Sequence, residues 1–198
     1  MPGASLLDTG ERDFPLRAVH TALAAVTALL AASALTACGD PFGGQEPLLR
    51  TDSITLASVT GPSPLATAID IATNNAPAQP ERPNEAGDWD FQVRTSGSSF
   101  ILHPNPGVAP YRGAGLQRTT RSFDDPGTAP RDNDNYQRTD VTVQPGEVYY
   151  AQSRQRNGTC GTLAKFGILK ILSVSVDSGL VHMVVTSNQN CDDERLEF

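Results

Sequence analysis

Residues 163–187 read LAKFGILKILSVSV, then DSG, then LVHMVVTS, and this stretch decides the fold class. Apolar and polar residues alternate through much of both outer runs, which is the pattern of β-strands. Asp177, Ser178 and Gly179 predict a tight hairpin turn, since glycine readily adopts the positive φ that such turns require. The first run is predicted to be a central strand that bends near Gly167, where the missing side chain permits a bulge. One face of this strand is predicted to carry Ala164, Phe166, Ile168, Leu172, Val174 and Val176.

Shorter runs elsewhere in the chain have the same strand-like character and are separated by glycine and proline. The predicted strands are residues 53–59, 65–73, 88–95, 98–103, 138–143, 147–154 and, at the end of the chain, 195–198. No segment after residue 37 shows a sustained helical period of apolar residues. We therefore predict an all-β fold, an antiparallel sandwich or open barrel that forms a single domain.

Two segments read as loops. Residues 74–87 are rich in Asn, Pro and Glu, and residues 104–135 contain five prolines and several glycines. So long a loop as the second is usually functional or mobile in a compact domain. Between the two loops, residues 88–95 place Trp89, Phe91 and Val93 on one face of a predicted strand. Asp88 and Asp90 are then expected on the solvent face, the pattern of a half-buried strand.

The N-terminal part of the chain predicts a lipid anchor. An uncharged, alanine-rich run covers residues 21–34, too short to span a bilayer, and it leads into Leu35, Thr36, Ala37 and Cys38. This pattern resembles the lipobox of bacterial lipoproteins, in which the cysteine is acylated and becomes the new N-terminus. The alternative is an ordinary secretory peptide whose cysteine is incidental. The resemblance divides the chain into a removed signal peptide (1–37), a lipid-anchored tether (38–50) and a β-domain (51–198).

Charge limits the partners of the mature chain. Residues 1–37 hold two of the 15 basic and three of the 22 acidic residues, so their removal leaves a net charge of about −6. An acidic balance argues against nucleic acid, whose binding needs a dense cationic face. The acyl chains must therefore supply the membrane attachment. Gly39 follows Cys38 where some inner-membrane lipoproteins carry Asp, which favours the outer membrane of a Gram-negative bacterium.

The cysteines fit a compartment outside the cytoplasm. Once Cys38 is assigned to lipid, Cys160 and Cys191 remain as an even pair, and a disulfide is the expected state of such a pair there. Two free thiols are the alternative. A zinc site is not indicated, because neither a CxxC pair nor a histidine lies near either cysteine.

The sequence contains few residues in patterns that are typical of catalysis, and we predict that the protein is not an enzyme. A nucleophile with its base would have to draw on His103 or His182, and no GxSxG motif accompanies any serine. Residues 132–135 (DNDN) resemble part of a calcium loop but lack the Gly and the distal Glu of an EF-hand. Residues 157–159 match a glycosylation sequon, which in a bacterial lipoprotein most often marks a turn.

Spaced motifs resemble one protein family. Residues 88–91 (DWDF) are similar to the DWDI-F strand of the HmuY-like lipoproteins. Residues 148–150 (VYY), a turn at Gly158, and residues 164–169 (AKFGIL) with the hairpin behind them are similar to that family's YVVRT-DG-YAK-IL ending. The resemblance implies an all-β domain on the outer membrane that binds haem through two axial His or Met ligands and passes it to a receptor.

The candidate haem ligands in this chain are His103, His182 and Met183, although none lies in a motif that matches the family. His103 ends a predicted strand beside the long loop, where a ligand can approach. His182 and Met183 alternate along their strand, so only one of them can face a given pocket. Haem or a similar apolar ligand is thus the expected cargo. The alternatives are a structural lipoprotein that docks a protein or an envelope glycan through residues 104–135 and, with least support, an envelope hydrolase.

Overall fold

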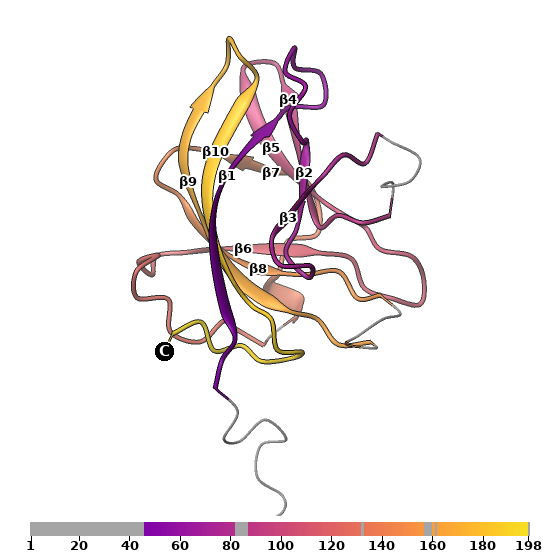
Figure 1. Ribbon diagram of the computed structural model, residues 1–198, viewed down its shortest axis with the longest axis vertical. Coiled ribbons are helices and arrows are strands. Elements are labelled where there is room, and N and C mark those ends of the chain that lie inside the picture. Colours follow the sequence, from indigo (N-terminus) through magenta and orange to yellow (C-terminus); the bar gives the residue numbers. More distant parts are fainter. Residues whose placement is uncertain (1–45, 82–86, 132, 157–159, 161, 198) are drawn as a thin grey trace, which may run out of the picture. The chain divides into compact units, whose positions relative to one another are not determined.

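The computed structural model describes residues 46–81, 87–131, 133–156, 160 and 162–197 (Figure 1). The described residues all belong to the compact unit Glu46–Phe198. The predicted signal peptide, Cys38, most of the predicted tether, Asp132 and the sequon at 157–159 lie outside the described residues. No helix in the described part of the chain is long and apolar enough to cross a bilayer.

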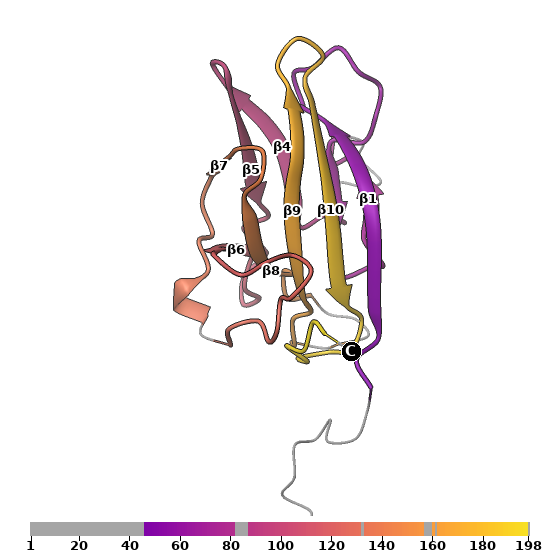
Figure 2. The same ribbon diagram turned by 90° about the vertical axis from the view of Figure 1, so that its left-hand side faces the viewer.

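Two antiparallel sheets of five strands each build the domain, and the predicted all-β sandwich is confirmed. Figure 2 shows the C-terminal hairpin and the N-terminal strand side by side, as neighbours in one of these sheets. In spatial order the first sheet contains β1 (Leu49–Ala57), β10 (Leu180–Asn188), β9 (Phe166–Ser175), β8 (Val148–Gln152) and β6 (Gly115–Thr119). The second contains β3 (Ala76–Ala78), β2 (Ala68–Asp70), β4 (Phe91–Ser96), β5 (Ser99–Pro104) and β7 (Val141–Val143). The helical element described between β6 and β7 is a single 3₁₀ turn, η2 (Asn133–Asn135).

The main core lies between the two sheets, where alternate side chains of facing strands meet. Its fully buried members include Phe91 and Leu102 from the second sheet and Leu169, Ile171 and Met183 from the first. A smaller apolar cluster lies on the other side of β8 and β9. It contains Ala129, Tyr136, Tyr150, Phe166, Ile168 and Leu196. The first half of β9 is thus buried on both faces, which explains why its sequence is apolar almost without interruption.

The β9–β10 hairpin is present as predicted, but the expected bulge position is wrong. Met183 pairs with Ile171 and His182 with Ser173, so Leu172 is the extra residue, and it is 41% exposed. The extra residue reverses the alternation along β9, because everything beyond it turns to the opposite face. The predicted single apolar face is therefore also wrong: Phe166 and Ile168 enter the smaller cluster, whereas Val174 packs against the main core.

Gly167 has a different role from the predicted bend. A Cβ atom on it would lie 2.8 Å from the backbone oxygen of Thr186 on the paired strand. The residue therefore allows β9 and β10 to approach closely, while the ladder stays regular at this point.

Residues 104–135 are not the structureless loop that their prolines and glycines predict, since they contain β6. Leu116 of β6 pairs with Ala151 of β8 and reaches the main core. A Cβ atom on Gly115 would lie 2.8 Å from Cβ of Tyr136. This glycine, which the sequence places in a predicted loop, is therefore needed because Tyr136 packs directly against the strand.

Three strand boundaries also differ from prediction. The predicted strand 65–73 is reduced to β2, the predicted loop 74–87 contains β3, and the predicted closing strand 195–198 is represented by an isolated bridge between Arg195 and Thr128. β2 and β3 pair over three residues only, a length at which an alternating pattern cannot be recognised in the sequence.

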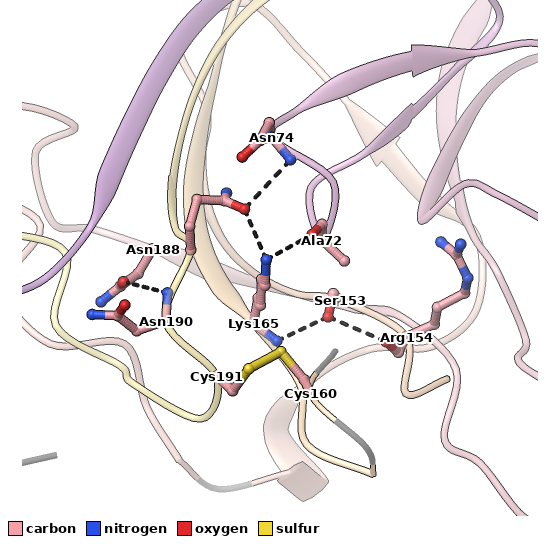
Figure 3. Close-up of a disulfide and its surroundings, with 10 residues drawn as sticks. Ala72, Asn74, Ser153, Arg154, Cys160, Lys165, Asn188, Asn190 and Cys191 are labelled. Carbon is pink, nitrogen blue, oxygen red and sulfur yellow. Dashed lines mark hydrogen bonds between the residues drawn. A yellow bond between two sulfur atoms is a disulfide. The ribbon is translucent and has the colours of Figure 1, made fainter. Parts of the chain in front are cut away.

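The predicted disulfide between Cys160 and Cys191 is present, with the Cα atoms 5.4 Å apart (Figure 3). Cys160 lies in the connection between β8 and β9, and Cys191 follows β10. Next to the bond, the backbone N–H of Asp192 donates to the backbone oxygen of Ala164. The disulfide therefore joins the ends of two neighbouring strand connections at one end of the sandwich.

Replacing both cysteines with serine is expected to lower the free energy of unfolding by about 2–4 kcal/mol, because the bond closes a loop of 31 residues in the unfolded chain. Urea unfolding under oxidising conditions measures the difference. The wild-type protein, fully reduced, is the matched control and should unfold at nearly the urea concentration of the double variant. Equal stability of the oxidised wild type and the double variant would contradict the expectation.

Candidate functional site

The three predicted haem ligands do not come together. Met183 is fully buried in the main core. His182, its neighbour on β10, points to the outer face of the first sheet, where Nε2 lies 2.8 Å from the hydroxyl of Ser53. His103 alternates with the buried Leu102 on β5 and therefore points to the outer face of the second sheet. His103 and His182 therefore lie on the outer faces of different sheets, and Met183 lies in the core between the sheets. One bound ligand cannot bridge His103 to either of the other two side chains in this arrangement.

His103 is held in a fixed orientation by two neighbours. Its Nδ1 lies 2.5 Å from Oδ1 of Asp140, and its ring packs 5.9 Å from the ring of Trp89 at an interplanar angle of 32°. A carboxylate only accepts hydrogen bonds, so Nδ1 carries the hydrogen, and in the neutral form of the ring Nε2 has a lone pair. A carboxylate behind the imidazole is the usual support of a metal-ligating histidine.

A cavity of about 480 Å³ opens on the same face of the second sheet. Its lining residues are Val59, Thr60, Pro80, Glu81, Trp89, Gln92, Arg94 and Thr95. Gln92 is the cross-strand partner of His103, and Trp89 both lines the cavity and contacts the His103 ring. His103 thus lies at the edge of a cavity that combines apolar walls with one arginine and one glutamate.

Asp90 corrects the prediction that both acidic neighbours of Trp89 face solvent. Its side chain is completely buried, whereas that of Asp88 is 69% exposed. The strand β4 begins at Phe91, after Asp90, so the alternation of the strand does not apply to this residue. Asp90 instead turns inward at the end of the sandwich, where backbone amides need acceptors.

Four N–H groups donate to the Asp90 carboxylate. Oδ2 accepts from the backbone N–H of Ile71 at 2.9 Å and of Ala72 at 3.2 Å. Oδ1 accepts from Arg154 twice, from its backbone N–H and from Nη1, both at 2.9 Å. Ile71 and Ala72 follow β2 of the second sheet, and Arg154 follows β8 of the first. One side chain therefore joins the two layers.

Further ion pairs extend this cluster beyond Asp90 and Arg154. Nη2 of Arg154 lies 3.4 Å from Oδ2 of Asp70, and Nη1 of Arg156 lies 3.2 Å from the same oxygen. Burial raises the pKa of Asp90 to about 7, and the charge of Asp70 adds to the increase, while Arg154 and the backbone amides oppose it. Sequence reasoning missed this cluster. The available signal was the Arg154–Arg156 pair, but nothing in its spacing indicates that acidic partners 64 or more positions earlier lie beside it.

Metal ligation by protein side chains alone is not indicated. Within the described ranges no group of three or more His, Cys, Asp or Glu side chains could hold a metal ion. Asp134, from the segment that resembles part of a calcium loop, is exposed within η2.

No protein-family model, curated protein or solved structure matches this chain. The candidate site is therefore identified from the geometry of the domain alone. Two features of that geometry stand out: His103 beside its cavity, and the buried charge cluster around Arg154.

Proposed function

We propose that this chain is a lipid-anchored, non-enzymatic binding protein of the bacterial cell envelope, similar to the HmuY-like lipoproteins. Its cargo is haem or a similar planar, largely apolar ligand. The lipobox ending at Cys38 supports the anchor, and the Cys160–Cys191 disulfide fits an oxidising compartment. The outer membrane of a Gram-negative bacterium is the proposed location.

The observation that carries this proposal is the orientation of His103. Asp140 holds Nδ1, which leaves Nε2 as a donor for iron, and Trp89 packs beside the ring where it can also contact a flat ligand. The adjoining cavity offers apolar surface from Val59 and Trp89, together with Arg94, which can pair with a carboxylate of the ligand.

Ligation in this proposal differs from that of the family's best-known members. His182 and Met183 belong to the other sheet, so His103 would hold the iron without either of them. Attachment through one side chain would also suit a carrier that must release its cargo.

Titration of the purified full-length protein with haemin in detergent tests the proposal. Binding through His103 is expected to give a shifted Soret band, and His103→Ala is expected to weaken binding at least tenfold. His182→Ala is the matched control, because it removes an equally accessible histidine from the opposite face and should leave the titration unchanged. A wild-type protein that gives no Soret shift, or His103→Ala binding as tightly as wild type, would overturn haem capture.

A second candidate function is docking of a protein or an envelope glycan. Val108 is 77% exposed in the turn before β6, where it borders a cavity of about 470 Å³ together with Trp89 and Tyr111. An exposed apolar side chain next to aromatic residues is typical of a recognition surface. Val108 and Tyr111 belong to the 104–135 segment that the sequence indicates for docking, and a haemin titration without a Soret shift would favour this function.

A further inference from the structure

A separate, smaller cavity lies where the turn after β2 meets the connection between β8 and β9, next to the disulfide (Figure 3). Its volume is about 230 Å³. The lining residues are Ala72, Thr73, Asn74, Ser153, Arg154, Arg156, Cys160, Leu163 and Lys165. The cavity therefore combines backbone from the second sheet with cationic side chains from the first.

The charge of this cavity is unusual for the chain that forms it. The whole chain has a net charge of −7, yet the described residues of this lining include three cationic side chains and no carboxylate. The carboxylates that pair with Arg154 and Arg156 are those of Asp70, Asp88 and Asp90, and none of them is among the described lining residues. A concave surface with one sign of charge concentrates ions of the opposite sign.

Lys165 has no carboxylate among the partners of its ammonium group. Nζ donates to the backbone oxygen of Ala72 at 2.8 Å and to Oε1 of Gln189 at 2.9 Å, both uncharged acceptors (Figure 3). An ammonium group has three hydrogens, so one is left for a ligand. Burial, and then the charge of Arg156, lower the pKa of Lys165, while the charges of Asp70 and Asp90 oppose the decrease.

The frame around Lys165 is rigid. Its backbone N–H donates to the hydroxyl of Ser153 at 2.9 Å, and its backbone oxygen accepts from the N–H of Ser153 at 2.9 Å. Arg154 is held by Asp90, and Arg156 donates to the hydroxyl of Thr73. Little ordering would therefore be needed when a ligand binds, which favours affinity.

We propose that this cavity binds a small oxyanion of the phosphate class, held by Lys165, Arg154 and Arg156. Guanidinium groups recognise tetrahedral oxyanions with paired N–H donors, and a lysine adds a point charge. The volume is below the range of about 300–1,000 Å³ that is usual for organic ligands, which suits a phosphate group rather than a larger molecule. This inference is independent of the proposed haem binding, since it uses different residues and a different cavity.

Two sources can supply this chemistry, free inorganic phosphate or the phosphodiester headgroup of a lipid. Isothermal titration of the full-length protein in non-ionic detergent, at constant ionic strength set with chloride, distinguishes them. One titrant is inorganic phosphate and the other is glycerophosphoglycerol, a soluble headgroup. Tighter binding of phosphate supports the free ion as ligand, and tighter binding of the diester supports a lipid headgroup. The absence of binding heat with both titrants would overturn the proposal.

Matched variants locate the binding site. Arg156→Gln is expected to weaken binding of the preferred titrant at least tenfold, and its side chain is exposed enough for the fold to tolerate the change. Arg118→Gln is the control, because Arg118 also pairs with a carboxylate, Glu147, but lies outside this cavity. Lys165→Met should weaken binding similarly, with Lys170→Met in the following strand β9 as its control. Wild-type affinity in Arg156→Gln and in folded Lys165→Met would overturn the assignment to this cavity.

Discussion

Replacing Arg154 with methionine is expected to lower the free energy of unfolding by about 3–5 kcal/mol, the largest stability effect that we predict. The Arg154 side chain is 4% exposed, and methionine fills similar space without charge. The substitution leaves Asp90 completely buried without its cation and weakens the neutralisation of Asp70. A buried carboxylate without a counter-charge is far more costly than a missing surface ion pair.

Urea unfolding monitored by the fluorescence of Trp89, which lies next to Asp90, measures this effect. Arg118→Met is the control: it breaks the exposed ion pair with Glu147, whose arginine is 71% exposed, and should cost less than about 1 kcal/mol. Adding Asp90→Asn to Arg154→Met removes the unpaired charge and should recover part of the loss. If Arg154→Met is no less stable than Arg118→Met, the buried cluster does not contribute as described.

The same cluster gives the stability a defined dependence on pH. The pKa of Asp90 is raised in the folded state from 3.8 to about 7, so folding favours the protonated form. Its contribution to the free energy of unfolding is therefore largest below about pH 4 and declines as the pH rises towards 7. Removal of the Arg154 charge raises this pKa further. The stability difference between wild type and Arg154→Met should consequently be larger at pH 7.5 than at pH 5.

Replacing Cys38 with alanine is expected to abolish lipid attachment completely. In the proposed anchor, acyl chains would supply about 0.8 kcal/mol for each buried CH₂ group, and the sequence after residue 37 shows no run of basic residues that could hold the chain on anionic lipid instead. The variant should either leave the membrane pellet or accumulate as a precursor that keeps residues 1–37. Membrane fractionation together with intact mass measurement distinguishes these results from wild type.

The double variant Cys160→Ser, Cys191→Ser is the control for this experiment. It also removes thiol chemistry from the chain, but it should still pellet with membranes and still carry the mass of an acylated Cys38. A Cys38→Ala protein with unchanged fractionation and unchanged mass would refute the lipobox assignment.

Local patterns in the sequence were sufficient for part of this structure. The β9–β10 hairpin depends on alternation and on a turn ending at Gly179, both of which are encoded within a few residues. The pairing of Cys160 with Cys191 follows from the number of cysteines once Cys38 is assigned to lipid. Both features were predicted correctly because neither requires knowledge of distant partners.

Features that depend on distant partners were missed. Leu172 is the bulge residue because β10 pairs with Ile171 and Ser173 on either side of it, and nothing in the composition of β9 marks that position. β6 is a strand because β8 pairs with it, although its own residues resemble a turn. Asp90 is buried because the amides of Ile71 and Ala72 and the guanidinium of Arg154 meet it there.

The candidate site shows the same division. His103 was predicted at the end of a strand, and it lies there, one residue before the end of β5. Its separation from His182 and Met183 follows from the assignment of β5 and β10 to different sheets, which alternation within each strand does not specify. Its support by Asp140 and Trp89 likewise depends on strand pairing across the second sheet.

The position of β1 has a mechanical consequence for a protein tethered through its N-terminus. β1 is an edge strand, and the tether enters it at Leu49, opposite Asn188 at the end of β10. A pull along β1 from that end loads the whole ladder with β10 in shear, so its hydrogen bonds resist together instead of breaking one after another. The backbone oxygens of Glu46 and Leu48 are also held, by Asn190 and Gln189. In the proposed anchored protein, drag on the domain would thus be borne by an entire strand pair.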